Sequence, residues 1–297
     1  MKTLLAIINQ PKESKEFIQY VAGMATDFRA NVHLMFVQNP NNYALGTMSS
    51  TGAPIEQLGT LGYPGTEVIE VQKNVEKLAH EAEETLTKYI KDVKSKMTKK
   101  VVIDFSAELG VSSVIAEKLV SENKIDMVVL EGQKNKNFWA QTSDNMEIIK
   151  SIECPVWIIP NALDYKPFSD ITYATDYKEE DINSLKSLIS LAEHFSYTIT
   201  ALHVTDSVDF KEKVKKEGFQ EMLQKKLVYG NLKVEVIDEN SKNLAEDIND
   251  YAMQNESDLV VILKENKSFL ERIFTSDSTK TLLKKSKLPI LVLHEKE

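Results

Sequence analysis

The sequence contains a single cysteine, Cys154, which excludes an internal disulfide and a metal site built from several thiolates. Its five histidines are scattered without HxxxH or HExxH spacing, so metal chemistry has no support. No apolar run is longer than about five residues, which is too short for a membrane span or a signal-peptide core. These absences predict a cytoplasmic protein with no metal site and no membrane contact.

Positive charge is outnumbered by negative charge. The chain has 36 Lys and Arg against 45 Asp and Glu, a formal net charge of −9. An acidic protein repels the nucleic-acid backbone, so we expect no nucleic-acid partner. The sequence also lacks GxSxG, GxxxxGK[ST] and a GxGxxG after a strand, and no pair of catalytic carboxylates can be placed. We therefore assign no catalytic residue and expect a non-enzymatic protein.

What the chain does contain is an internal repeat. The first 37 residues align without a gap with the segment that ends at residue 204, at an offset of 167 that matches Ala25 with Ala192 and Phe28 with Phe195. Later segments correspond at offsets of about 132 to 134: KVVIDFSAELG with LKVEVIDENSK, IDMVVLEGQ with SDLVVILKE, and ECPVWIIP with KLPILVLH. The order of elements is therefore duplicated.

Each copy alternates short apolar runs with longer helical stretches, which is typical of parallel strands covered on both faces. The sequence predicts an α/β fold with two tandem doubly wound five-stranded parallel sheets. We predict domains at 1–163 and 168–297, with the boundary near residue 164 in the link PNALDYKP. The expected strands lie near 3–8, 32–37, 100–105, 126–131, 156–159, 171–175, 198–204, 232–237, 258–263 and 290–294.

The clearest helix is expected over 67–97, where an apolar stripe recurs at three- or four-residue steps. The stripe comprises Val68, Val71, Val75, Leu78, Ala82, Leu86, Tyr89, Val93 and Met97. Before it lies a long loop, 39–66, which holds five of the ten glycines and has no counterpart in the second half. Such a loop is either a loosely packed flap or a binding element.

Three pieces of the second half resemble the universal stress protein family in order and spacing: YATDYKEEDINSLKSLISLAEHF, ALHVTD and LPILVLH. The resemblance covers nearly the whole chain as two tandem copies and is stronger in the second half. It implies an adenine nucleotide alpha hydrolase-like fold and a stress-response role. The last strand of this family commonly mediates dimerisation, so the resemblance implies that residues 156–159 and 290–293 pair antiparallel within one chain.

The tandem protein would then be its own pseudo-dimer. We expect Ile158, Ile159, Leu291 and Leu293 at the seam, with the alternative that they face only their own cores.

Family members that bind ATP carry Gly-x2-Gly-x9-Gly-Ser after the fourth strand, because glycine lets backbone N–H groups approach phosphate at a helix N-terminus. In the second half the resemblance places Leu263, Asn266 and Ser276 at the glycine positions and Asp277 at the serine position. In the first half it places Glu131, Lys134, Thr142 and Ser143 there. Both phosphate loops are therefore expected to be eroded.

The protein supplies its own anion instead. Ser276 is expected as the N-cap of the last helix and Asp277 in its first turn, while Asp144 has nearly the same role in the first half.

The adenine side is better preserved in the second half. The resemblance places Asp176 where the family's first-strand aspartate meets the nucleoside, and Val204 where a valine lines the adenine slot, whereas Asn9 replaces the aspartate in the first half. Alternatively, Asp176 only caps a turn. The candidate nucleotide site is Asp176, Val204, Asn266, Ser276 and Ser278.

Three functions remain open from the sequence. The first is a non-enzymatic stress-response protein that acts through interaction or weak ligand sensing. The second is a switch that binds ATP or AMP in the second half only. The third is an enzyme on the same sheet, such as a slow ATPase.

Overall fold

The computed structural model describes residues 2–8, 10–38, 65–97, 99–123, 125–131, 143–160, 163–191, 197–241, 244–264 and 288–294. The first half alternates strands with helices. Its strands are β1 (Lys2–Ile8), β2 (Ala30–Gln38), β3 (Ile103–Leu109), β4 (Met127–Glu131) and β5 (Val156–Ile159). Its helices are the short 3-10 helix η1 (Pro11–Glu13), α1 (Lys15–Phe28), α4 (Gly65–Lys96), α5 (Ser112–Asn123) and α6 (Ser143–Ser151).

The second half repeats this order. Its strands are β6 (Asp170–Ala174), β7 (Thr198–Thr205), β8 (Leu232–Asp238), β9 (Leu259–Leu263) and β10 (Ile290–Leu293). Its described helices are α7 (Glu180–Leu191), α8 (Phe210–Lys226) and α9 (Leu244–Gln254).

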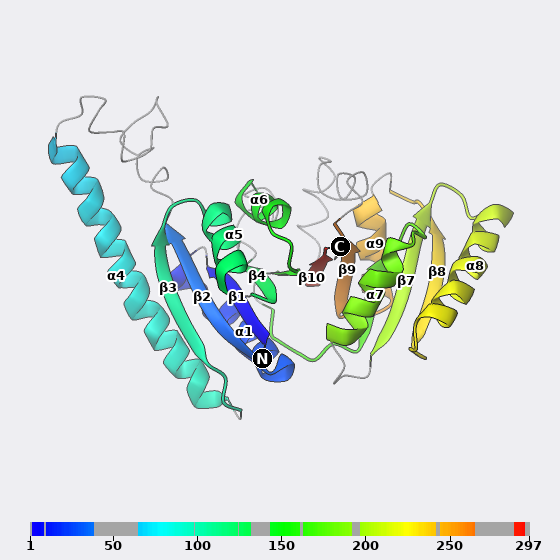
Figure 1. Ribbon diagram of the computed structural model, residues 1–297, viewed down its shortest axis with the longest axis horizontal. Coiled ribbons are helices and arrows are strands. Elements are labelled where there is room, and N and C mark those ends of the chain that lie inside the picture. Colours follow the sequence, from blue (N-terminus) through cyan, green and yellow to red (C-terminus); the bar gives the residue numbers. More distant parts are fainter. Residues whose placement is uncertain are drawn as a thin grey trace.

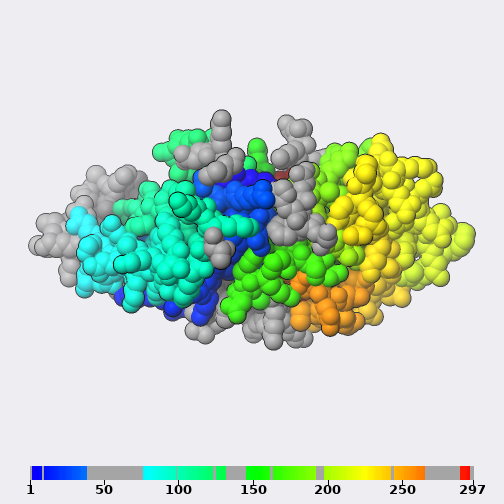
Figure 2. Space-filling view, turned by 90° about the horizontal axis from the view of Figure 1, so that it is seen from below, coloured from blue at the N-terminus to red at the C-terminus, as the bar shows by residue number. Residues whose placement is uncertain are grey.

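All ten strands belong to one sheet, in the order β3-β2-β1-β4-β5-β10-β9-β6-β7-β8 (Figure 1). Neighbouring strands are parallel except β5 and β10, which run antiparallel at the centre. The α/β fold of two similar halves is thus confirmed, and the two predicted sheets are joined into one. In the space-filling view the two halves lie end to end along the long axis (Figure 2).

The central pairing is the antiparallel contact that the family resemblance implies. Its register pairs Ile290 with Ile158, Leu291 with Trp157 and Val292 with Val156. All four predicted seam residues are buried, with Leu291 at 0% exposure. The pairing leaves neither strand with a free edge, so the chain contains its own pseudo-dimer seam.

Two hydrophobic cores cover the sheet, one on each face, and both include residues from both halves. One core contains side chains of α1, α4, α7 and α8, and the other contains side chains of α5, α6 and α9. An aromatic chain crosses the seam in the first core: the ring centroids of Phe28 and Trp157 are 6.1 Å apart, and those of Trp157 and Phe168 are 5.9 Å apart. The halves therefore share their hydrophobic stabilisation.

Helix α4 confirms the long helix that the apolar stripe predicts. Within its described side chains, Ala82, Leu86 and Val93 are buried and Tyr89 packs against the same core. The loop predicted over 39–66 lies outside the described residues, except that Gly65 and Thr66 begin α4. The predicted domain boundary near residue 164 stays a prediction.

The third strand is the one strand that the sequence places wrongly. The expected range was 100–105, but β3 spans Ile103–Leu109, and the apolar Val102 before it is 56% exposed. Register shows the cause: Val32 pairs with Ile103 in the first half, and its counterpart Ile199 pairs with Leu232 in the second. The two strands thus correspond at an offset of 129 rather than 132, because Val101 and Val102 precede the strand and Ile103 is its first residue.

Within the described ranges, no helix combines the length and the apolar character that crossing a bilayer requires.

Candidate functional site

The parallel strands β6 and β7 end side by side, and both described residues of the candidate nucleotide site lie at these ends. The last register pair is Ala174 with Leu202, and Asp176 and Val204 each lie two residues beyond it. Val204 is buried in the core that includes α9, whereas 29% of the Asp176 side chain is exposed. The structure thus brings these two residues together. Asn266, Ser276 and Ser278, together with Asp277, lie outside the described residues.

Asp176 lies in a tight turn between β6 and α7. The next residue, Tyr177, has φ of 60°, in the left-handed region that most side chains avoid. Its N–H donates to Thr175 Oγ1 at 2.9 Å, and its ring packs on His203 and Phe219 with centroid distances of 4.3 and 5.1 Å. Side-chain packing therefore holds a backbone conformation that is intrinsically unfavourable.

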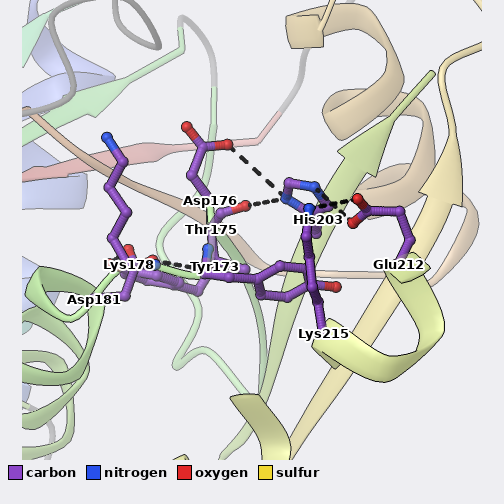
Figure 3. A network of polar contacts seen from close by, with 9 residues as sticks. Tyr173, Thr175, Asp176, Lys178, Asp181, His203, Glu212 and Lys215 are labelled. Atoms are coloured by element: carbon purple, nitrogen blue, oxygen red, sulfur yellow. Dashed lines mark hydrogen bonds and ion pairs between the residues drawn. The ribbon is translucent and has the colours of Figure 1, made fainter. Parts of the chain in front are cut away.

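A buried carboxylate, Asp181, supports the turn from below (Figure 3). Asp181 is in the first turn of α7 and is only 3% exposed. It accepts hydrogen bonds from Tyr173 Oη at 2.8 Å, Thr175 Oγ1 at 2.6 Å and the Lys178 N–H at 3.0 Å. Burial raises the pKa of Asp181, and these hydrogen bonds act against the rise.

The first half has a related arrangement at the start of α1. Ser14, the counterpart of Asp181 at the offset of 167, is fully buried, and its Oγ lies 2.7 Å from Glu131 Oε2 and 2.8 Å from the Gln10 carbonyl oxygen. Glu131 ends β4 and is 8% exposed. Each half therefore has a buried carboxylate near the N-terminus of its first helix, where the helix dipole favours negative charge.

The sequence also predicts acidic residues in the first turns of two later helices, Asp144 and Asp277, of which Asp277 lies outside the described residues. Helix α6 begins at Ser143, so Asp144 lies in its first turn as predicted. The sequence pattern does not predict the buried carboxylates near the N-termini of α1 and α7. A signal for Asp181 existed, since it lies in the first turn of the helix that follows a predicted strand.

His203 lies between the turn and helix α8, with Asp176 on one side and Glu212 on the other (Figure 3). Its Nδ1 lies 2.8 Å from the Thr175 carbonyl oxygen and 3.9 Å from Asp176 Oδ1. Its Nε2 lies 3.8 Å from Glu212 Oε2. No pattern in the sequence assigns a role to His203 or Glu212.

Two of the positions that correspond to the family's phosphate-loop glycines are described, and both carry buried side chains. Leu263 ends β9, pairs with Leu293 and is 6% exposed. Glu131 is the corresponding residue at the end of β4. Glycine at either position would leave room for a close backbone approach, whereas these side chains occupy that space.

Other chemistry finds little support among the described residues. No group of three or more His, Cys, Asp or Glu side chains in these ranges is arranged to hold a metal ion. Burial raises the pKa of the Cys154 thiol to about 12, so at neutral pH it is protonated and a poor nucleophile.

The fold is that of tandem α/β stress-protein structures, as comparison with solved proteins shows. A universal stress protein from Archaeoglobus fulgidus DSM 4304 is 10% identical, with a TM-score of 0.63 over 99% of this chain and 97% of that chain. A protein from Pseudomonas aeruginosa UCBPP-PA14 is 12% identical, with a TM-score of 0.57 over 99% of this chain and 93% of that chain.

Residues 167–294 match the universal stress protein family, so this part of the chain is a domain of that family. No curated protein matches the sequence. The cytoplasmic domain of a prokaryotic cation chloride cotransporter is also similar in fold, at 12% identity and a TM-score of 0.50 over 98% of this chain and 94% of that chain. The fold alone therefore does not define the function.

Proposed function

We propose that the protein is a non-enzymatic member of the universal stress protein family that acts through interaction or weak ligand sensing, with both phosphate-binding loops lost. The observation that carries this proposal is the pair of buried side chains, Leu263 and Glu131, at the first glycine position of each loop. The proposal keeps the cytoplasmic location that the sequence predicts.

Electrostatics supports the loss of triphosphate binding in the first half. A phosphate charge about 4 Å from the Glu131 carboxylate would meet a repulsion of roughly 4 kcal/mol at an effective dielectric constant near 20. That corresponds to several hundredfold in affinity. In the second half the described obstacle is steric, because Leu263 fills the corresponding position as part of a hydrophobic core. The Asp277 carboxylate, expected in the first turn of the last helix, would add electrostatic repulsion.

The adjacency of Asp176 and Val204 supports a second candidate, a switch that binds ATP or AMP in the second half. These residues would contact the nucleoside, and Asn266, Ser276 and Ser278 would lie toward the phosphates. A monophosphate carries fewer charges to accommodate, so AMP suits this candidate better than ATP.

Thermal melting of the full-length protein with millimolar ATP, AMP or adenosine separates the two candidates. A ligand at 100 times its Kd stabilises a protein by about 2.7 kcal/mol, which moves the melting temperature measurably. We expect no ATP-dependent rise. A rise that Asp176→Ala abolishes, and that a control substitution of the exposed Asp250 by Ala leaves intact, would favour the nucleotide switch.

The non-enzymatic part of the proposal needs its own measurement. We expect purified protein to release no phosphate from ATP above the uncatalysed rate. Turnover that survives repeated purification and disappears in Asp176→Asn would support the enzymatic alternative.

A further inference from the structure

The hydrogen-bonding state of His203 is set by its neighbours. The Thr175 carbonyl oxygen, 2.8 Å from Nδ1, can only accept a hydrogen bond, so Nδ1 carries a hydrogen. In the neutral ring Nε2 is therefore an acceptor without a hydrogen.

The group that faces Nε2 is also an acceptor. Glu212 Oε2, 3.8 Å from His203 Nε2, is buried and has no hydrogen-bond partner. The other carboxylate oxygen of Glu212 accepts from Lys215 Nζ at 2.6 Å, and the Glu212 N–H donates to the N-cap residue Asp209. The first turn of α8 thus holds the Glu212 carboxylate in place, but only one of its two oxygens accepts a hydrogen bond.

The remaining charged groups around the imidazole are mostly negative. Asp176 faces it from the turn after β6, and Tyr177 from the same turn covers the ring face. Burial raises the pKa of the Tyr177 hydroxyl, and the nearby carboxylates of Glu212 and of Glu235 on β8 raise it further. This hydroxyl therefore stays neutral. Two cations of α8 are already paired, Lys215 with Glu212 and Lys216 with Glu235.

We propose that protonation of His203 closes a link between helix α8 and the turn that carries Asp176. A proton taken from solvent onto Nε2 turns this atom into a donor toward Glu212 Oε2, while Nδ1–H stays on the Thr175 carbonyl. The imidazolium then lies between two carboxylates, and Glu212 gains its missing partner. A small shortening of the 3.8 Å contact completes the hydrogen bond.

The link joins three elements that are otherwise separate in sequence: the turn after β6, the end of β7 and the first turn of α8. Its effect falls on Asp176, which shares the turn with Thr175 and Tyr177. The structure therefore assigns a proton-responsive function to this end of the second half, independent of whether any nucleotide binds.

Titration of the full-length protein by NMR, with labelled histidine and backbone amides, tests the proposal directly. The His203→Gln variant assigns the His203 signals. In the wild-type protein we expect the neutral His203 ring to carry its hydrogen on Nδ1, and the ring signals to change when Nε2 takes up a proton. Amide signals of residues 175–178 and 210–213 should shift with the same midpoint, and this coupling should vanish in His203→Gln.

Glu212→Gln supplies the matched variant, since it removes the charge and keeps the size of the side chain. We expect it to move the His203 midpoint to lower pH by about 0.5–1 unit. Glu221→Gln, on the exposed face of the same helix, should leave the midpoint unchanged. An unchanged midpoint in Glu212→Gln, or α8 amides that ignore the titration in the wild-type protein, would overturn the proposal.

Discussion

The carboxylate of Asp126 accepts a hydrogen bond from the Thr3 N–H at 2.7 Å, while the Asp126 N–H donates to the Thr3 carbonyl oxygen at 2.9 Å. The second half repeats this reciprocal contact: Asp258 accepts from the Asp170 N–H at 3.2 Å and donates to the Asp170 carbonyl oxygen at 2.7 Å. Each half therefore fixes the start of its first and fourth strands in the same way.

Removal of the second of these carboxylates should destabilise the protein. Asp258 also accepts from the Ser169 N–H and forms an ion pair with Lys166. Burial works against the charge, but the hydrogen bonds from Lys166, Ser169 and Asp170 outweigh it and lower the pKa of Asp258. We expect Asp258→Ala to reduce the free energy of unfolding by about 2–3 kcal/mol at pH 7, measured by urea denaturation.

Because the pKa of Asp258 is lowered in the folded protein, the stability lost in Asp258→Ala depends on pH. The stability that Asp258 contributes is present above the pKa of an unfolded aspartate, near 4, and is lost as the pH falls through its lower folded value. The difference between wild type and Asp258→Ala should therefore shrink at pH 3. An equal loss in Asp250→Ala, whose side chain is exposed, would show that the network is not responsible.

The seam between the halves should be a major source of stability. Leu291 on β10 is fully buried and lies opposite Trp157 of β5. We expect Leu291→Ala to cost about 2–5 kcal/mol, since it deletes buried methyl groups and leaves a cavity. The same substitution at Leu109, which is 53% exposed, should cost less than about 0.5 kcal/mol. Similar losses at both positions would contradict a shared core.

Two side chains of the second half cap helix α6 of the first, and one of them gives stability a pH dependence. Lys264 Nζ donates to the carbonyls of Lys150 and Ile152, and His294 Nε2–H donates to the carbonyl of Ile149. Burial, together with the nearby Lys264, lowers the pKa of His294 to about 4.

Because the unfolded chain binds this proton near pH 6.5 and the folded chain only near pH 4, the contribution of His294 is fully present above pH 6.5. It is lost as the pH falls from there to about 4, with an amplitude on the order of 3 kcal/mol. We expect His294→Gln to flatten the stability profile in this window. The matched variant His80→Gln, at a residue whose side chain is 72% exposed, should leave the profile unchanged.

The two outer strands should depend on helix side chains for protection against self-association. Gln220 of α8 accepts from the Val234 N–H at 2.7 Å and donates to the Leu232 carbonyl at 3.4 Å, in the place of a further strand. Lys94 of α4 donates to the Ile103 carbonyl, the structural counterpart of Leu232, at 3.0 Å. Since exposed edges attract other strands, Gln220→Ala should increase self-association in sedimentation velocity. Gln224→Ala, at an exposed position of α8, should not.

Much of the fold could be predicted because most strands are short, fully apolar runs that are recognisable in the sequence. Fully apolar runs such as Val156–Ile159 and Ile290–Leu293 can only be buried, and their order repeats. The position of β3 could not be derived in this way. Its residues Asp104, Ala107 and Glu108 are exposed at the sheet edge, so hydropathy favoured the preceding valines.

The candidate site was predicted less completely. Asp176 and Val204 follow from the resemblance, but Asp181, His203 and Glu212 act through contacts across three elements. Such contacts depend on side-chain directions in the folded sheet, which a periodic pattern does not contain. The resemblance places Glu131 only at a position where the family has glycine. Its contact with Ser14, 117 residues away in sequence, is visible only in the folded structure.

Native mass spectrometry of the full-length protein, equilibrated with millimolar ATP and then freed of excess ligand, tests the central claim most directly. It reports both the number of chains in the particle and any retained nucleotide. We predict a single chain without bound ATP, since the seam is satisfied within the chain and the first glycine position of each phosphate loop carries a buried side chain. A stoichiometric ATP adduct that resists dilution would contradict this account.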